Sequence, residues 1–150
     1  MPSTQRLLRE GHPNRLGLKG WIAGGRWGPD RYLYALHRLT GLALLLYFVA
    51  HIFVTSARAF GQSRWEAVMG SVSGPLFLFG EFLVFAAFTF HAINGLRLAL
   101  AEVGIGTGAP IEPVFPYKTS LDSQRPLVIV GLLLIAGLVV VGALDLFVWR

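Results

Sequence analysis

Three of the four histidines in this chain, His37, His51 and His91, lie in otherwise apolar stretches. An imidazole ring can ligate a metal, exchange hydrogen bonds or take up a proton. In apolar surroundings each of these roles requires a partner, because an unpaired polar group costs free energy there. The fourth histidine, His12, lies among charged residues and is interpreted as a solvated loop residue. We therefore expect the chemistry of the chain at His37, His51 and His91.

The spacing of these histidines places small residues beside them. His91 and Gly95 are four residues apart and share one helix face. His37 and His51 are fourteen residues apart, close to four helical turns, and Gly41 falls on nearly the same face. A histidine beside a small residue leaves room for a flat macrocycle such as haem, whose iron imidazole ligates. A membrane histidine can equally well hydrogen-bond a neighbouring helix, and spacing alone leaves both interpretations open.

The composition indicates a membrane protein, with 54% hydrophobic and 14% charged residues in 150. Three apolar segments, at about 36–57, 76–101 and 126–149, are long enough to cross a hydrocarbon layer of about 30 Å. Each must be helical, because a lone strand would leave its backbone polar groups unpaired in lipid. The sequence therefore predicts an all-α membrane protein with three transmembrane helices in a single membrane-anchor domain, 1–150. The other residues form an arm, 1–35, and two loops, 58–75 and 102–125.

The distribution of charge predicts the orientation. Seven Lys and Arg residues lie before or at the start of the first segment, whereas the 58–75 loop carries two. By the positive-inside rule the N-terminus faces the cytoplasm, in a cell inner membrane. The first segment is too long for a signal peptide, and we expect it to remain in the mature protein. Because the cations lie at helix ends, they favour lipid headgroups over nucleic acid as partners.

Short stretches and single residues of the sequence indicate several further structural features. Residues 63–72 have the apolar spacing of a short surface helix, and Gly74 and Pro75 break the chain before the second segment. Pro126 can open the third segment at a position that needs no N–H donor.

Arg97 ends the second segment, and we expect it to extend to lipid headgroups, with a cofactor carboxylate or a partner subunit as alternatives. The chain contains no cysteine, which excludes disulfides and thiolate-bound iron–sulfur clusters.

Two motifs carry a resemblance to a known family. "LHRLTG" (36–41) opens the first segment and "FHAINGLRLAL" (90–100) closes the second. Together they resemble the cytochrome b subunit of succinate dehydrogenase, the small three-helix anchor of complex II, over essentially the whole chain. The resemblance implies that His91 is an axial ligand of haem b. It also implies that His37 and Arg38 lie at the haem propionates and that Arg38 lies at the quinone pocket.

Two positions depart from the pattern of this family. Some members have a quinone-contacting serine where this chain has Tyr34, whose hydroxyl can also donate to a quinone. His51 has no counterpart in single-haem members and resembles the first-helix histidine of two-haem relatives. Counting about 1.5 Å per residue from the cytoplasmic ends of the helices puts His91 about 10–14 Å deep and His51 about 22 Å deep. One haem iron would be awkwardly placed to bind both histidines at these different depths. Either another chain supplies the second ligand, or two haems are held.

The resemblance implies a role in respiratory electron transfer. Electrons from succinate would pass through a flavoprotein subunit and an iron–sulfur subunit to a quinone, whose carbonyl Arg38 would polarise. A second membrane-anchor subunit would complete a heteromeric helix bundle, since three helices only half enclose a porphyrin. This chain would supply no flavin or cluster site of its own. Alternatives are a haem-less anchor, a structural assembly subunit, a quinol:fumarate reductase working in reverse, and a transporter component, which the lack of broken spans disfavours.

Overall fold

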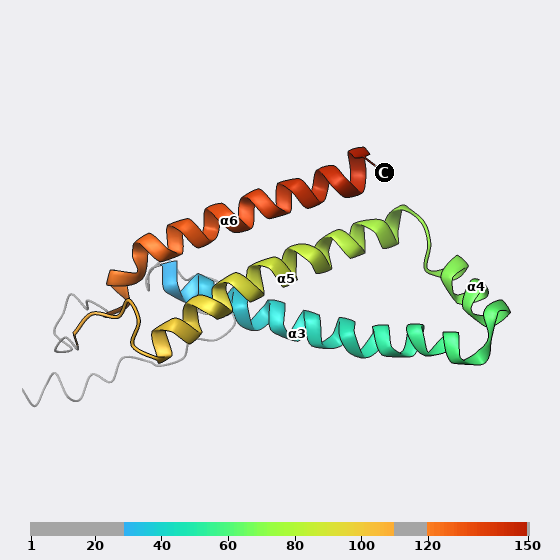
Figure 1. The fold of residues 1–150 in the computed structure, drawn as a ribbon, viewed down its shortest axis with the longest axis horizontal. Helices are drawn as coiled ribbons and strands as arrows, with labels where there is room; N and C mark the ends of the chain where they lie inside the picture. The colour runs from blue at the N-terminus through green and yellow to red at the C-terminus, as the bar shows by residue number, and fades with distance from the viewer. Residues whose placement is uncertain (1–28, 110–119, 150) are drawn as a thin grey trace, which may run out of the picture. The chain divides into compact units, whose positions relative to one another are not determined.

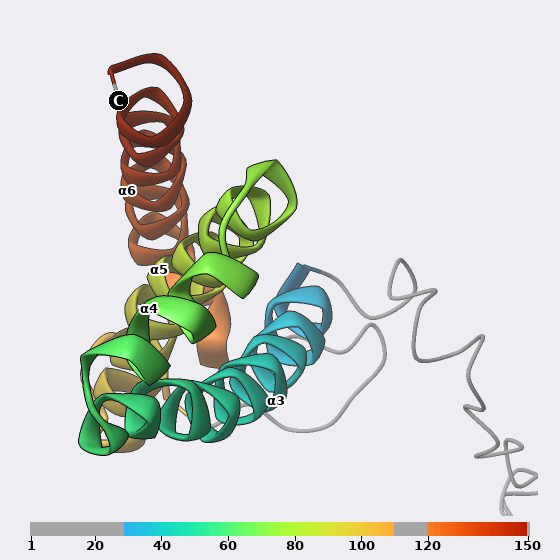
Figure 2. The same cartoon turned by 90° about the vertical axis from the view of Figure 1, so that its right-hand side faces the viewer.

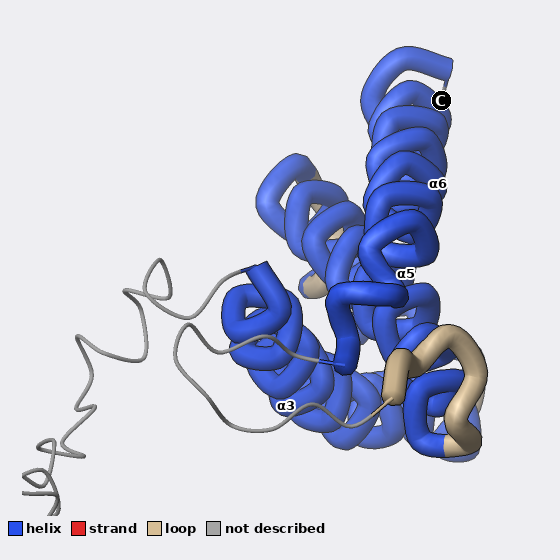
Figure 3. The backbone as a smooth tube through the Cα atoms, turned by 90° about the vertical axis from the view of Figure 1, so that its left-hand side faces the viewer, coloured by secondary structure: helices blue, strands red, loops and turns tan. Residues whose placement is uncertain are grey.

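The computed structural model describes residues 29–109 and 120–149, and all regular secondary structure among them is helical (Figures 1 and 3). The prediction of an all-α protein is therefore confirmed. The elements, in chain order, are α3 (Pro29–Ser56), a 3-10 helix (Ala57–Phe60), α4 (Gln62–Ser71), α5 (Pro75–Glu102), a second 3-10 helix (Ser120–Gln124), α6 (Arg125–Leu144) and a π-helix (Asp145–Trp149).

The contacts of the chain divide it into two compact units, Met1–Leu36 and His37–Arg150, and each is described by itself. The first unit contributes residues 29–36, the opening turns of α3, to the described part. The second unit contains the rest of α3 and all of α4, α5 and α6. The sequence-based assignment of one domain over 1–150 remains a prediction, and most of the predicted arm, residues 1–28, lies outside the described residues.

Prolines mark the starts of the three long helices. α5 begins at Pro75, and α6 carries Pro126 in its first turn, as predicted. α3 begins at Pro29 and has Asp30 in its first turn, so it starts seven residues before the predicted residue 36. The predicted crossing segment, about 36–57, was defined by apolar residues only, and it lies within the helical segment Pro29–Phe60. A proline that needs no N–H donor and an acidic residue at the positive end of the helix dipole start the helix earlier.

Three helical segments have the length and composition to cross a membrane: Pro29–Phe60, Pro75–Glu102 and Asp122–Trp149. They correspond to the three predicted segments in order, and each is longer than predicted. The prediction of three transmembrane helices is confirmed. The cytoplasmic placement of the N-terminus remains a prediction.

The connection between the first two long helices contains the predicted short helix. α4 covers residues 62–71, against a predicted 63–72, and follows α3 at the end nearest the viewer in Figure 2. Gly61 and Gly74 flank it with φ values of 98° and 112°, a region that favours glycine. The guanidinium carbon of Arg58 lies 5.8 Å from the Trp65 ring centroid, which ties α4 to the end of α3.

α5 packs against α6 through glycines on α6. The two helices lie side by side in Figure 1. A Cβ atom added to Gly131 would lie 3.4 Å from Cγ2 of Ile93, and one added to Gly142 would overlap the Phe85 ring. Small residues let helix backbones approach closely, which is how helices associate where lipid removes the hydrophobic driving force.

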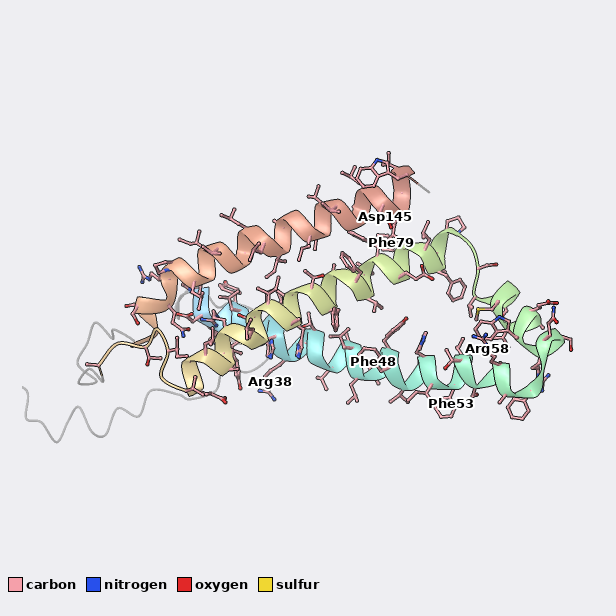
Figure 4. The ribbon with its side chains drawn as sticks, in the orientation of Figure 1. Arg38, Phe48, Phe53, Arg58, Phe79 and Asp145 are labelled. Carbon is pink, nitrogen blue, oxygen red and sulfur yellow. The ribbon has the colours of Figure 1, made fainter. Side chains whose placement is uncertain are left out.

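The interior of the described part is more polar than its surface. Large apolar side chains such as Phe53 and Phe79 are exposed, at 73% and 51% (Figure 4). Among the described residues, the buried side chains include five polar and four apolar ones. The buried apolar residues are Leu33, Leu44, Ala57 and Phe90, and the buried polar residues are Thr40, Thr89, Asn94, Arg97 and Gln124. Lipid or other protein must therefore cover the apolar faces.

The close contact at Gly142 leads to a first prediction. Gly142→Leu should destabilise the α5–α6 pair by about 1–3 kcal/mol, because the new side chain overlaps the Phe85 ring. Gly137→Leu is the matched control, since nothing lies within 4 Å of a Cβ at Gly137. The free energy of unfolding in detergent micelles measures the difference. Equal stability of the two variants would contradict the packing described here.

Candidate functional site

α3 and α5 meet through two reciprocal contacts between a histidine and a glycine. A Cβ added to Gly41 on α3 would lie 2.9 Å from Cε1 of His91 on α5. A Cβ added to Gly95 on α5 would lie 3.2 Å from Cε1 of His37 on α3. Each glycine therefore makes room for the imidazole of the opposite helix. The sequence prediction assigned the same space to a porphyrin.

The two imidazoles also contact one another. The ring centroids of His37 and His91 are 4.0 Å apart and their planes differ by 7°, so the rings are stacked face to face. Both side chains are half-buried. Residues fifty-four positions apart in the sequence thus form one compact pair. The structure brings together four of the predicted site residues: His37, Gly41, His91 and Gly95.

Hydrogen bonds determine which nitrogen of His91 carries the proton. Its Nδ1 lies 3.1 Å from the backbone carbonyl oxygen of His37 and 3.3 Å from Oγ1 of Thr40. A carbonyl oxygen only accepts, so the close Nδ1 atom must be the donor. The lone pair of the neutral ring is then on Nε2. Thr40 in turn donates its hydroxyl proton to the His37 carbonyl, over 3.0 Å.

His37 and Asn94 each contain a buried nitrogen without a partner. Within residues 29–109 and 120–149, neither Nδ1 of His37 nor Nδ2 of Asn94 has a hydrogen-bond partner. Asn94 is only 5% exposed and lies one turn after His91 on α5. Unpaired buried polar atoms are rare in folded proteins, and each one calls for an explanation. Both nitrogens belong to residues at or next to the crossing of α3 and α5.

The predicted quinone residues lie on the surface. Arg38 is exposed on α3, and its side chain points away from α5 (Figure 4). Tyr34 is 52% exposed and belongs to the first unit. Both side chains are accessible from outside the described part of the chain.

The predicted ligand of a second haem, His51, lies apart from the stacked pair. It is exposed on α3, and its Nδ1 lies 3.4 Å from the hydroxyl of Tyr47. The two rings have centroids 5.4 Å apart. These contacts stay within one helix, so His51 remains accessible to another chain or to a ligand.

Arg97 differs from its predicted role. It is only 6% exposed, so the expectation that it extends to lipid headgroups is wrong. Its Nε donates to Oδ1 of Asn94 over 3.1 Å, and an NH1 hydrogen is directed at Oε1 of Gln124, 3.4 Å away. Gln124, 1% exposed, donates to the carbonyl of Ile105 over 3.1 Å. This network joins α5, the following loop and the entry to α6, which stabilises Arg97 inside the protein.

Three polar residues of this site were not singled out from the sequence: Thr40, Asn94 and Gln124. Thr40 lies within the motif "LHRLTG". Asn94 lies within the motif "FHAINGLRLAL", one helical turn from His91, so the two motifs could have pointed to both residues. Gln124 lies in a connection without periodicity, and nothing in the sequence pairs it with Arg97. Its contact depends on how the chain returns from α5 to α6.

Bare metal ions need several protein ligands, and the histidine pair does not supply them alone. Within residues 29–109 and 120–149, no group of three or more His, Cys, Asp or Glu side chains could hold a metal ion. A single imidazole with a free Nε2 is instead suited to a metal whose other ligands come from elsewhere.

The three helices have the length and apolar composition of a multi-pass membrane protein, and polar residues lie where α3 and α5 meet. Comparison with known families identifies which one. Residues 22–141 match the family described as the succinate dehydrogenase/fumarate reductase transmembrane subunit, and the chain belongs to this family. The predicted resemblance to a complex II membrane anchor is thereby confirmed.

Individual relatives agree with the family. The chain is 33% identical over 73 residues to the succinate dehydrogenase hydrophobic membrane anchor subunit of Archaeoglobus fulgidus, covering 49% of this chain and 62% of that protein. It is 25% identical over 77 residues to the succinate dehydrogenase 2 membrane subunit SdhC of Mycobacterium tuberculosis, covering 51% and 57%. It is 29% identical over 96 residues to the hydrophobic membrane anchor subunit of Halobacterium salinarum, covering 61% and 74%.

These alignments are partial. The chain spans about three fifths of the length of the Archaeoglobus and Mycobacterium proteins. No solved structure matches the chain.

The buried network at Arg97 leads to a second prediction. Arg97→Met should lower the free energy of unfolding by about 2–5 kcal/mol, because the acceptor oxygens of Asn94 and Gln124 lose a charged donor. Arg125→Met is the control: Arg125 forms an exposed pair with Asp122 at 2.9 Å, worth at most about 1 kcal/mol. Unfolding in detergent micelles compares the variants. If both lose the same stability, Arg97 is not part of a buried network.

Proposed function

We propose that this chain is the haem b-binding membrane anchor of a succinate:quinone oxidoreductase, forming part of its quinone site. Membership of the transmembrane-subunit family supports the anchor role. The haem part depends on one observation, the contact of His91 Nδ1 with the His37 carbonyl. That contact leaves Nε2 of His91 as a free lone pair in a half-buried site.

The residues of the crossing fit a haem. A porphyrin supplies four ligands to its iron, so the protein must add only axial ones, and Nε2 of His91 is suited to be one of them. His37 and Arg38 are the candidates for the propionate groups, because Arg38 carries a permanent positive charge at an exposed position. The unpartnered Nδ1 of His37 is consistent with a polar group of a ligand nearby.

A bound haem would supply reversible one-electron storage beside the quinone. The second axial ligand would come from another chain, and His51 is the candidate ligand of a second haem. Its exposed position on α3 supports a contact outside this chain. The proposal therefore covers one haem b or two.

Arg38 would act directly on the quinone. Its guanidinium would donate hydrogen bonds to a quinone carbonyl and stabilise the negative charge that develops on the oxygen during reduction. Arginine stays protonated in proteins, so Arg38 would not supply the protons that complete the quinol. Tyr34, also exposed on α3, is a further candidate for a quinone contact.

The family description, a transmembrane subunit, supports association with other subunits. We propose that the chain holds an iron–sulfur subunit and a flavoprotein subunit at the inner membrane, with its N-terminus in the cytoplasm. The exposed apolar faces of its helices support a second membrane-anchor subunit beside lipid. The same parts would serve quinol:fumarate reduction in the opposite direction.

A second candidate is an anchor without haem. The fit of each imidazole over a glycine of the other helix favours it, because His37 and His91 then serve helix packing. In that case Arg38 and the quinone would remain, and the assembled complex would lack a b-type spectrum.

A third prediction separates these candidates. The purified wild-type complex should show a b-type spectrum, reduced minus oxidised, with stoichiometric haem. His91→Ala should lose at least one haem per complex, since no other group replaces the lost Nε2. His51→Ala should keep that haem and lose only a second one, where two are present. A wild-type complex without a Soret band would overturn the haem proposal and leave the haem-less anchor.

A fourth prediction concerns the quinone. Arg38→Met should lower the rate of quinone reduction on the order of 10²-fold, because the developing oxyanion loses its charged donor. Arg58→Met is the control, an exposed arginine at the opposite end of the same helical segment. Steady-state assays on the assembled complex with a soluble quinone give kcat and KM. Rates that stay equal in both variants would remove Arg38 from the quinone site.

A further inference from the structure

We propose that Thr40 is a positioning residue: its hydroxyl holds the Nδ1–H of His91 and so keeps Nε2 free for iron. The inference rests on the proposed role of His91 as a haem ligand and adds a residue that determines how that ligand is held. It also predicts a property of the haem, its reduction potential, that the proposed function leaves open.

The geometry forms a closed triangle of three polar groups. Oγ1 of Thr40 lies 3.0 Å from the His37 carbonyl oxygen and 3.3 Å from Nδ1 of His91. The same Nδ1 lies 3.1 Å from that carbonyl. The carbonyl can only accept, so both other groups direct their hydrogens toward it. Oγ1 lies within reach to accept the proton of Nδ1 as well, which is then shared between two acceptors.

Burial strengthens this arrangement. Thr40 is 8% exposed, and the triangle lies where the two helices are in contact through Gly41 and His91. Hydrogen bonds are stronger where the surroundings are apolar, and an imidazole with only one good orientation is held in one tautomer.

Thr55 shows that the cross-helix contact is not a general property of threonines on this helix. Its Oγ1 donates to the carbonyls of His51 and Ile52, at 2.7 and 3.2 Å, so it makes the usual contacts within its own helix. Its hydrogen bonds are exposed and do not reach α5. Thr55 therefore provides a control with the same side chain and the same bond within the helix.

The expected effect follows from ligand basicity. An acceptor at Nδ1–H pushes electron density toward Nε2, which favours the ferric over the ferrous state of a bound iron. Without the Thr40 hydroxyl, only the His37 carbonyl remains as acceptor. The ferric form should lose about tenfold in stability relative to the ferrous form, which corresponds to about 59 mV upward in reduction potential.

The test is a redox titration of the assembled complex with its haem. Thr40→Val keeps the shape of the side chain and removes the hydroxyl. We expect a potential about 59 mV higher than in the wild type, with an altered low-spin ferric signal in electron paramagnetic resonance. Thr40→Ser should restore both readouts, and Thr55→Val should leave both unchanged. Should Thr40→Val fail to assemble, Thr40→Ala replaces it with the same expectation.

The outcomes separate this inference from the proposed function. A wild-type complex that holds haem on His91, with unchanged potential and spectrum in the variant lacking the hydroxyl, overturns the role of Thr40 and leaves the haem proposal intact. An equal shift in Thr55→Val also overturns it, because the effect would then belong to the helix as a whole. A wild-type complex without haem overturns both.

Discussion

A single hydrogen bond between two helices, from Nδ1 of His91 to the backbone carbonyl of His37, organises the polar interior of this protein. It fixes the tautomer of His91, and the stacked ring of His37 restricts its orientation. The two glycines opposite the rings let the helices come close enough for this bond to form. The proposed haem ligand and the neighbouring Thr40 both lie at this crossing of α3 and α5.

The environment of the crossing explains why polar residues are inside and apolar residues outside. In lipid, apolar side chains gain little from contact with one another, so helices associate through close packing and hydrogen bonds. Thr40, Asn94, Arg97 and Gln124 accordingly lie in the interior, where their partners are other parts of the chain. An arginine in such a place is expensive unless its donors are used, and the Arg97 network uses them. The exposed apolar faces remain for lipid and for the proposed second anchor subunit.

The sequence predicted the helices and the histidines better than the contacts between them. Length and hydropathy were enough for three spans, because a membrane leaves few alternatives. Helical spacing correctly placed His91 and Gly95 on one face, and His37 with Gly41 on another, but it could not show that each glycine receives the imidazole of the other helix. Arg97 was misplaced because its partner Gln124 is twenty-seven residues away in the sequence, and only tertiary structure brings them together. α3 begins before the apolar segment because Pro29 acts through backbone geometry and Asp30 through the helix dipole, and neither adds hydropathy.

The most direct measurement is an experimental structure of the assembled complex in its membrane environment, at a resolution that orients the His91 ring. The account predicts haem iron bound to Nε2 of His91, with Nδ1 facing the His37 carbonyl and the Thr40 hydroxyl. Iron bound to Nδ1, iron held by a different residue of this subunit, or a His91 ring turned away from the His37 carbonyl would contradict it.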